Sequence, residues 1–403
     1  MSGQNLKQAC RLKQRHHDLY KQLGERKKRE MISLRESLRK SKQSLRYCSR
    51  YITTPCQDWS QNRHLLAGDA HFLILRHRAH LTKYYDGFVR WLETEKPAVR
   101  SRFALHSLPY SPRDWSRIRL LVPWLPDPLL HESPIVYGRL KRIEEACRQR
   151  GIAVINPVDH LLRTAKSTGA EFVRSVGIRT PRATPINDIR HPERCLHKAE
   201  LEFPLLIRED RAHAGRLPIY LVKDLRELLE VPLHQFEHPI AVEFIDVRDS
   251  QDGFSRRYRY FAAGDLGMAM NLHCSKEWEV RGRNAIRDTR IEQEELAFIR
   301  APDPNHERLQ AARKALGLDF VAFDYSYGKD GELIVWEANV MPGLAYPKPS
   351  QHRPYLQTIA ERAFALTLNL YYNRSGLKLP ECVAQEVATP PSCWFGRDWS
   401  RAA

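Results

Sequence analysis

The sequence has few cysteines and no long hydrophobic run. Its 403 residues include 8 cysteines, which are scattered without a Cys-x-x-Cys pair or the spacing of a metal site. That usage is typical of reduced thiols in a reducing compartment. No stretch approaches the roughly 20 apolar residues of a membrane span, and the first ten residues lack an apolar signal-peptide core. We therefore expect a cytoplasmic protein without a membrane span.

The chain does contain enough hydrophobic sequence for a large core. Hydrophobic residues make up 42% of it, and 403 residues suffice for two or three domains. The formal charge is +17, and residues 1–60 carry fifteen Lys and Arg against five Asp and Glu. More than half of the positive excess therefore lies in the first 60 residues.

This basic segment has the periodicity of amphipathic helices. Between Leu6 and Leu45, hydrophobic residues recur at intervals of three, four or seven, with Lys and Arg between them. Such helices could bind nucleic acid or an anionic membrane, or they could dock on the rest of the protein with their charged face in solvent. Without aromatic interleaving or a nucleic-acid motif, the pattern favours docked helices.

The order of elements predicts an α+β protein. We expect helix over 64–94, a linker over 96–115, a small parallel α/β unit from 118, and an antiparallel α+β region from 201. The tail after about residue 377 is expected to be a loop anchored by Trp394 and Trp399, or disordered. The predicted domains are a basic helical extension with linker (1–115), an α/β domain (116–185), an α+β domain (186–375) and a C-terminal tail (376–403).

One predicted hairpin carries carboxylates on two otherwise apolar and aromatic strands. Asp330-Gly331 separates two β-rich runs, which predicts a type I′ turn with φ > 0 at both residues. A two-residue loop there puts Asp324 directly opposite Glu337, and a four-residue loop makes them diagonal neighbours. Both registers bring the two carboxylates together.

An asparagine adds a third oxygen to this pair. Asn339 follows Glu337 by two residues, so the strand period places both on one face, which we expect to be the face of Leu333 and Val335. Like charges across strands repel by roughly 0.2–1 kcal/mol, and a divalent cation would reverse that repulsion. Oxygen-only ligands suit Mg²⁺ completed by phosphate and water. The alternative is a solvated sheet face whose acids pair with Lys and Arg.

With Asp324, the Glu-Ala-Asn run at Glu337 and the Pro-Gly pair that follows, the sequence resembles the ATP-grasp superfamily, in particular ribosomal-protein glutamate ligases, glutathione synthetases and D-alanine ligases. The resemblance covers about residues 118–372. It implies an ATP-grasp fold preceded by a small α/β domain. It also implies that Asp324, Glu337 and Asn339 hold Mg²⁺, or Mn²⁺, against the phosphates of ATP.

The same resemblance implies an adenine site. The run Glu243, Phe244, Ile245 and Asp246 resembles the strand between the two lobes that sandwich ATP, and its first three residues would line the adenine. Asp246 or Asp249 would contact the ribose. The alternative is an ordinary strand with one acidic residue.

Three basic residues match the family's phosphate contacts. Lys166 stands at the interval of the first phosphate-region lysine, Arg208 replaces the lysine that reaches the α- and β-phosphates, and Arg259 matches the arginine beside the phosphates or the acyl phosphate. Arginine keeps the charge and offers a two-pronged donor. The chain departs from the family pattern in three further places. Ala165 stands where an Asp usually precedes the lysine, Gly215 stands alone in the phosphate-covering loop, and Arg257 stands where an acid often contacts the ribose.

The implied reaction is ATP-dependent ligation. A carboxylate of a small molecule or a peptide takes the γ-phosphate as an acyl phosphate, which an amine or thiol then attacks. Arg283 and Asn284 join Arg259 as candidate catalytic residues, because they resemble an Arg-x-Asn segment that contacts substrate, and the neighbouring arginines suggest an acidic substrate.

Two other functions stay open from the sequence. One is an ATP-grasp kinase with the same metal site, and the other is a non-catalytic nucleotide-binding scaffold that uses the basic N-terminal helices. Many relatives are dimers or tetramers, so a homo-oligomer is also an open expectation.

Overall fold

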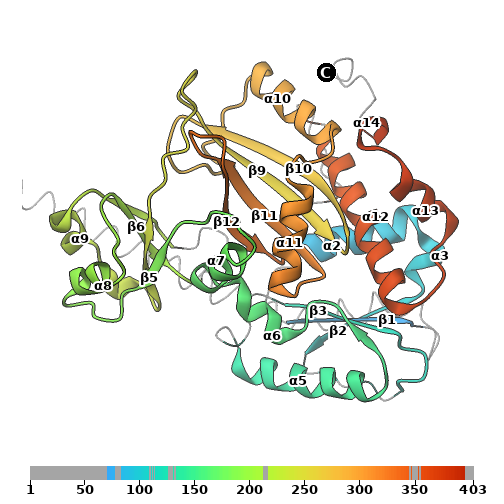
Figure 1. Ribbon diagram of the computed structural model, residues 1–403. Coiled ribbons are helices and arrows are strands. Elements are labelled where there is room, and N and C mark those ends of the chain that lie inside the picture. Colours follow the sequence, from blue (N-terminus) through green and yellow to red (C-terminus); the bar gives the residue numbers. More distant parts are fainter. Residues whose placement is uncertain are drawn as a thin grey trace, which may run out of the picture. The chain divides into compact units, whose positions relative to one another are not determined.

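The computed structural model describes residues 70–77, 83–108, 110, 112, 114–125, 130, 133–211, 217–344, 346, 353 and 355–394 (Figure 1). The basic helices expected between Leu6 and Leu45, the loop with Gly215 and the expected anchor Trp399 lie outside these residues. The described residues form one parallel and two antiparallel four-stranded sheets. The predicted α+β class is therefore confirmed.

The parallel sheet has the strand order β2-β1-β3-β4. All six residues of the inner strand β1 are buried, as is typical of a parallel strand covered on both faces. The elements of this region are β1 (Phe72–His77), α2 (Lys83–Glu95), α3 (Pro97–Arg100), β2 (Phe103–Leu108), β3 (Leu120–Trp124), α5 (Pro134–Gln149) and β4 (Ala153–Val154).

Two expectations from the sequence are wrong in this sheet. The helix expected over 64–94 is interrupted by β1, and the linker expected over 96–115 contains α3 and β2. β1 begins Phe-Leu-Ile-Leu, and an apolar run buried on both faces lacks the alternation that separates a strand from a helix. The sheet consequently takes strands from both sides of the domain boundary predicted at 115/116.

The second sheet is small and antiparallel, with the order β5-β8-β6-β7. Its core is formed by buried aliphatic residues such as Leu205, Ile207 and Leu228. The elements from the end of the first sheet onward are α6 (Val158–Leu161), η1 (Leu162–Thr164), α7 (Lys166–Arg174), β5 (Ala183–Pro185), α8 (Pro192–Lys198), β6 (Leu205–Glu209), β7 (Tyr220–Val222), α9 (Leu225–Glu230), η2 (Leu233–Gln235) and β8 (Pro239–Glu243).

The third sheet is the larger antiparallel one, with the order β10-β9-β11-β12. One face buries Phe323 and Tyr325 in a cluster that includes Leu309 of α11, and the other buries Phe261 in a cluster that includes Phe364 of α12. The elements are β9 (Ser255–Ala263), β10 (Leu266–Ser275), α10 (Thr289–Arg300), α11 (His306–Leu316), β11 (Phe320–Tyr327), β12 (Leu333–Asn339) and α12 (Tyr355–Ser375).

The C-terminal segment is helical where the sequence predicts a loop. It forms α13 (Glu381–Ala388) and α14 (Pro391–Trp394), and Val383 is fully buried. The loop prediction is wrong because two helical turns offer too few repeats to show a period. The anchoring role expected for Trp394 is confirmed, since its indole N–H donates to the carbonyl of Glu386 at 3.0 Å and the Arg362 guanidinium lies 5.5 Å from its ring centroid.

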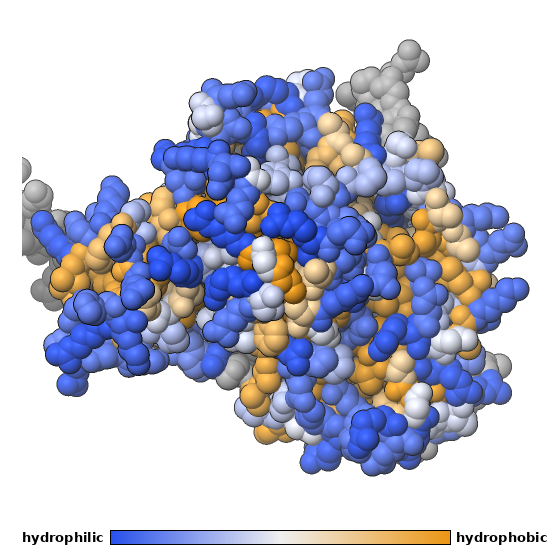
Figure 2. Space-filling view, viewed as in Figure 1, coloured by the Kyte–Doolittle hydropathy of each residue, from blue (hydrophilic) through white to orange (hydrophobic). Residues whose placement is uncertain are grey.

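Hydrophilic residues predominate on the surface shown in Figure 2. Within the ranges that the structure describes, no helix is both long and apolar enough to cross a bilayer.

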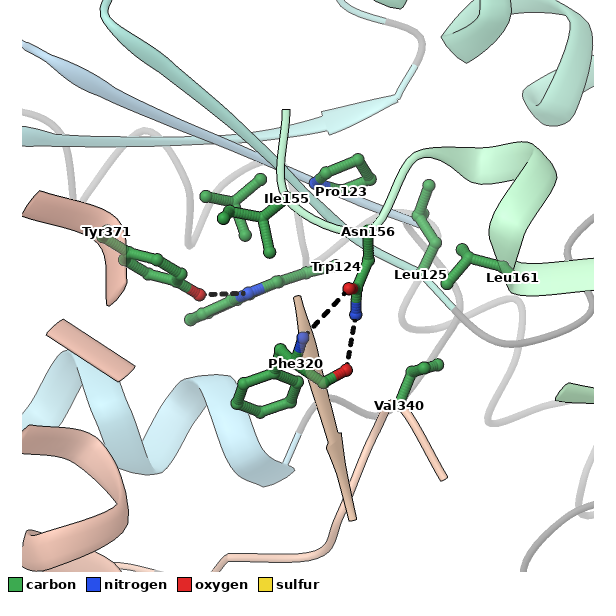
Figure 3. Close-up of a pocket in the computed structure, with 10 residues that line it drawn as sticks. Pro123, Trp124, Leu125, Ile155, Asn156, Leu161, Phe320, Val340 and Tyr371 are labelled. Atoms are coloured by element: carbon green, nitrogen blue, oxygen red, sulfur yellow. Dashed lines mark hydrogen bonds between the residues drawn. The ribbon is translucent and has the colours of Figure 1, made fainter. Parts of the chain in front are cut away.

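Asn156 joins the end of the parallel sheet to the start of β11 (Figure 3). Its side-chain N–H donates to the carbonyl of Phe320 at 2.8 Å, and its Oδ1 accepts from the backbone N–H groups of Asp319 at 2.8 Å and Phe320 at 3.1 Å. Nearby, the indole N–H of Trp124 donates to the hydroxyl of Tyr371 at 3.0 Å. The cavity that these side chains help to line measures about 10 Å³, room for about one water, so this junction is structural.

We predict that Asn156→Ala lowers the free energy of unfolding by about 2–4 kcal/mol, because it deletes two buried hydrogen bonds and one partly buried one and puts alanine at a φ of +49°. Urea unfolding at pH 7 measures the change. Asn373→Ala, at an exposed position of α12, is the control and should change stability by less than about 0.5 kcal/mol. Equal urea midpoints for Asn156→Ala and the wild type would contradict the prediction.

Candidate functional site

The turn of the acidic hairpin is not the predicted type I′ turn. Gly331 has φ = +77°, but Asp330 is not among the residues with positive φ, which a type I′ turn requires. The backbone N–H of Gly328 donates to the carbonyl of Glu332 at 2.8 Å and closes a longer loop. The first pair of the ladder, Tyr327 with Leu333, is therefore offset by one residue from both predicted registers.

A β-bulge on β12 then restores the pairing of the carboxylates. Tyr325 lies opposite Val335, but Asp324 lies opposite Glu337, so two residues of β12 span one residue of β11. The extra residue is Trp336. The register therefore confirms the predicted pairing of Asp324 with Glu337, although by a different route.

The bulge also decides which face of the sheet carries these side chains. Without it, Glu337 would follow Val335 onto the buried face by the strand period of two. Because the extra residue reverses the alternation, Glu337 and Asn339 lie on the face of Asp324. The expectation that they share the face of Val335 is wrong for this reason.

One row of four polar residues crosses the whole sheet. Asn271 of β10 lies opposite Arg259 of β9, Arg259 lies opposite Asp324 of β11, and Asp324 lies opposite Glu337 of β12. Directly opposed residues in antiparallel strands share a face and are close neighbours. The row thus places an amide, a guanidinium and two carboxylates side by side.

The side chain of Asp324 is 2% exposed and is held by two arginines. Arg259 donates from Nε to Oδ1 at 2.5 Å and from Nη2 to Oδ2 at 2.8 Å, and Arg257 lies 3.4 Å from Oδ2. Burial raises the pKa of this carboxyl, but Arg259 and Arg257 outweigh burial and lower the pKa to about 2. Asp324 is therefore ionised at neutral pH.

Arg208 brings a further cation to these carboxylates from the second sheet. Burial lowers the pKa of its guanidinium, and the charge of Glu337 opposes that shift. Its Nε is shielded from solvent and has no hydrogen-bond partner among the described residues. A shielded, charged N–H donor is well suited to an anionic oxygen.

Lys166 begins α7 and is buried beside the end of β6. Its Nζ lies 3.4 Å from the carbonyl oxygen of Asp210. Ser167 donates to the Asp210 carboxylate from its backbone N–H at 2.9 Å and from its hydroxyl at 2.8 Å. These bonds tie the start of α7 to the segment that carries Arg208, two residues before Asp210.

The oxygens of this face fit a hard divalent cation. The Oδ1 of Asn339 accepts from the backbone N–H of Met341 at 2.8 Å and has a second lone pair available. Each carboxylate oxygen of Asp324 accepts from Arg259 and also has a second lone pair available. The described residues contain no group of three His, Cys, Asp or Glu side chains arranged for a metal. A cation here would therefore be held by Asp324, Glu337 and the Asn339 amide, with ligand-derived oxygens completing its shell.

The predicted adenine segment makes several contacts of its own. Glu243 accepts from the backbone N–H of Arg182 at 3.0 Å, and the ring of Phe244 packs edge-on against Trp278 with centroids 6.0 Å apart. Asp246 accepts from Arg248 at 2.9 Å, and these bonds lower the pKa of its carboxyl. Ile245 lies between them and is partly buried. The nucleotide contacts of these four residues stay predictions.

Arg283 and Asn284 lie in the loop after β10. Arg283 is 72% exposed and lies 3.5 Å from Glu279. The Asn284 amide accepts from the backbone N–H of Arg281 at 2.8 Å and donates to the Glu279 carbonyl at 2.6 Å, so it stabilises a turn. Their substrate-binding role also stays a prediction.

Two residues of this face, Asn271 and His273 on β10, were not identified from the sequence. The only local signal is the Gly264-Asp265 turn, and counting from it pairs Asn271 with Tyr258, on the other face. An extra residue at Met270 shifts the register and brings Asn271 opposite Arg259.

No family model matches the sequence, and no curated protein does. Several solved structures match. They include the VanG D-Ala:D-Ser ligase from Enterococcus faecalis (14% identity, 74% of this chain and 99% of that one, TM-score 0.46) and the ATP-grasp ligase PsnB with a minimal precursor (15%, 74% and 100%, 0.43). A RimK domain protein ATP-grasp from Sphaerobacter thermophilus also matches (15%, 67% and 92%, 0.41).

PsnB and the Sphaerobacter protein are ATP-grasp proteins, the superfamily that the motif resembles. PsnB was also solved with its minimal precursor, Mg and ADP (14%, 74% and 98%, 0.43). Because the identities and TM-scores are low, the case for function rests on the residues of this chain.

We predict that Arg259→Gln lowers the free energy of unfolding at pH 7 by about 3 kcal/mol, because it leaves the buried Asp324 carboxylate with one weaker partner. Arg259→Gln/Asp324→Asn should regain most of the loss. The gap to the wild type should narrow progressively as the pH falls from about 4 towards about 2, since Asp324 then takes up a proton in the unfolded state while the native ion pair still excludes it. Urea unfolding from pH 7 to pH 3 tests both statements, and a double variant no more stable than Arg259→Gln would contradict them.

Proposed function

We propose that the chain is an ATP- and Mg²⁺-dependent ligase of the ATP-grasp type, which joins a carboxylate to an amine or a thiol. The observation that carries the proposal is the polar row on the third sheet, where Asp324 and Glu337 face each other beside Arg259 and the unpaired Nε of Arg208.

The local charge supports an anionic metal complex rather than a bare metal ion. Arg208, Arg257 and Arg259 act on Asp324 and Glu337. Arg208 is also acted on by Asp210, which lies beside Lys166, and by the ion pair of Arg281 with Glu279. The positive charges of this group therefore outnumber the negative ones by one. A lone Mg²⁺ would add to a positive excess, whereas Mg²⁺ with ATP brings net negative charge. The site should therefore bind the metal together with the nucleotide.

Each basic residue has a distinct part in this proposal. Arg208 would donate from its shielded Nε to a phosphate oxygen, and Lys166 would add charge from the start of α7. Arg259 holds Asp324 ionised and in place for the metal. Bound Mg²⁺ would supply positive charge between these carboxylates and the phosphates. Phosphoryl transfer depends mainly on such positioning and neutralisation.

The proposed chemistry has two steps. An oxygen of the substrate carboxylate bonds to the γ-phosphorus of ATP as the bond to ADP breaks, which yields an acyl phosphate. The amine nitrogen or thiol sulfur then bonds to the acyl carbon, and phosphate leaves with the bonding electrons and takes up the proton of the attacking group.

We predict that calorimetry detects binding of the ATP analogue AMPPNP only with Mg²⁺, and that Glu337→Gln weakens it at least tenfold, because the variant removes one metal-held charge without changing shape. Glu332→Gln is the matched control, since Glu332 lies in the same hairpin and pairs with Arg179 instead. Equal affinities of Glu337→Gln and the wild type would contradict the metal–nucleotide site.

We also predict that hydroxylamine, added with ATP, Mg²⁺ and a carboxylate substrate, traps the acyl phosphate as a hydroxamate with release of ADP. A screen of small carboxylates and peptides, read by ADP release and ferric-hydroxamate colour, tests this. A stable phosphorylated alcohol as product would show a kinase instead.

A further inference from the structure

Beside the proposed metal–nucleotide site, β9 and β10 carry a second group of polar side chains on the same face. Arg257 and Arg259 are two residues apart on β9, and they lie opposite His273 and Asn271 of β10. All four are partly exposed, whereas the side chain of the neighbouring Asp324 is 2% exposed. The group is therefore accessible next to the buried carboxylate.

The hydrogen bonds of this group leave donors available. Nη2 of Arg257 lies 3.2 Å from Nδ1 of His273, and a guanidinium can only donate, so Nδ1 accepts and the proton of the neutral imidazole lies on Nε2. Among the described residues neither Nε2 of His273 nor the amide of Asn271 has a hydrogen-bond partner. An imidazole N–H and an amide N–H are thus available on one edge strand.

The charge around His273 is positive. Burial first, and then the charges of Arg257, Arg259 and Arg287, lower the pKa of His273 to about 3, while the carboxylate of Asp324 opposes this shift. The loop with Arg287 lies close, since a Cβ at Gly282 would be 3.9 Å from Cε1 of His273. Three guanidinium groups against one carboxylate leave a net positive charge around His273, which a bound anion would neutralise.

We propose that Asn271, His273 and Arg257 form the subsite for the substrate carboxylate, beside the metal-binding pair. This inference rests on the proposed ligase function and places the subsite on β10 instead of on Arg283 and Asn284. Arg257 supplies the charge, and Asn271 and His273 donate to the carboxylate oxygens. In the row, only Arg259 separates Asn271 from Asp324, so an anion held at Asn271 lies on the same face as the proposed metal–phosphate site, with one strand between them.

The test uses acetate as the carboxylate probe on the full chain labelled with ¹⁵N-histidine. Acetate is titrated with and without Mg²⁺ and AMPPNP, and the His273 resonance is assigned from its loss in His273→Gln. We expect acetate to shift Nε2 of His273 in the wild type. Asn271→Ala and His273→Ala should weaken acetate binding at least fivefold and the binding of AMPPNP with Mg²⁺ less than twofold.

Variants at exposed positions serve as controls, and charge-changing and donor-retaining variants test the proposed contacts in a second way. His234→Gln and Asn373→Ala, at exposed positions outside the row, should bind acetate as the wild type does. Asn271→Asp adds a negative charge and should abolish acetate binding, whereas His273→Gln keeps an N–H donor and should recover part of it. Unchanged acetate affinity in Asn271→Ala and His273→Ala, or an acetate shift confined to another histidine, would overturn the proposal.

The two proposals can fail separately. If AMPPNP with Mg²⁺ does not bind while acetate still binds through Asn271 and His273, the ligase function is wrong and the anion subsite stands. If AMPPNP binds and acetate does not depend on these residues, the subsite is wrong and the ligase function stands.

Discussion

The ion pair between Arg259 and Asp324 is the interaction on which the candidate site depends. It joins β9 to β11 through two parallel hydrogen bonds and keeps a carboxylate ionised although its side chain is 2% exposed. Removing either partner of such a pair leaves an uncompensated buried charge. The pair also fixes the electrostatics, because Asp324 is already neutralised before any ligand binds. Glu337 is likewise opposed by Arg208, so a cation bound between these carboxylates would be best balanced by the negative charge of a nucleotide.

Two β-bulges place the polar side chains of the candidate site on one face of the third sheet. The extra residue at Trp336 moves Glu337 and Asn339 onto the face of Asp324, and the extra residue at Met270 moves Asn271 onto the same face. Without them the strands would still pair, but these polar side chains would lie on the face buried against α11. The indole N–H of Trp336 donates to the hydroxyl of Ser326 at 2.7 Å, a bond that ties the bulged strand to its partner.

These bulges also mark the limit of what the sequence predicts. The α+β class follows from the order of the apolar runs. The Asp-Gly turn and the strand period predict the pairing of Asp324 with Glu337, but in the structure that pairing depends on the bulge at Trp336. The face does not follow, because no residue type marks Trp336 or Met270 as an insertion and each reverses the alternation beyond it. Strand β1 was missed for another reason, since burial on both faces removes its alternation. His273 could not be identified from the sequence, because only its position opposite Arg257 on β9 makes it a candidate site residue.

The most direct test of the account is a crystal structure of the chain with Mg²⁺ and AMPPNP. We predict a magnesium ion about 2.0–2.1 Å from oxygens of Asp324, Glu337 and Asn339, shared with the phosphates, and a phosphate oxygen that accepts from Nε of Arg208. A nucleotide bound elsewhere, or a metal ion bound without these three residues, would contradict it.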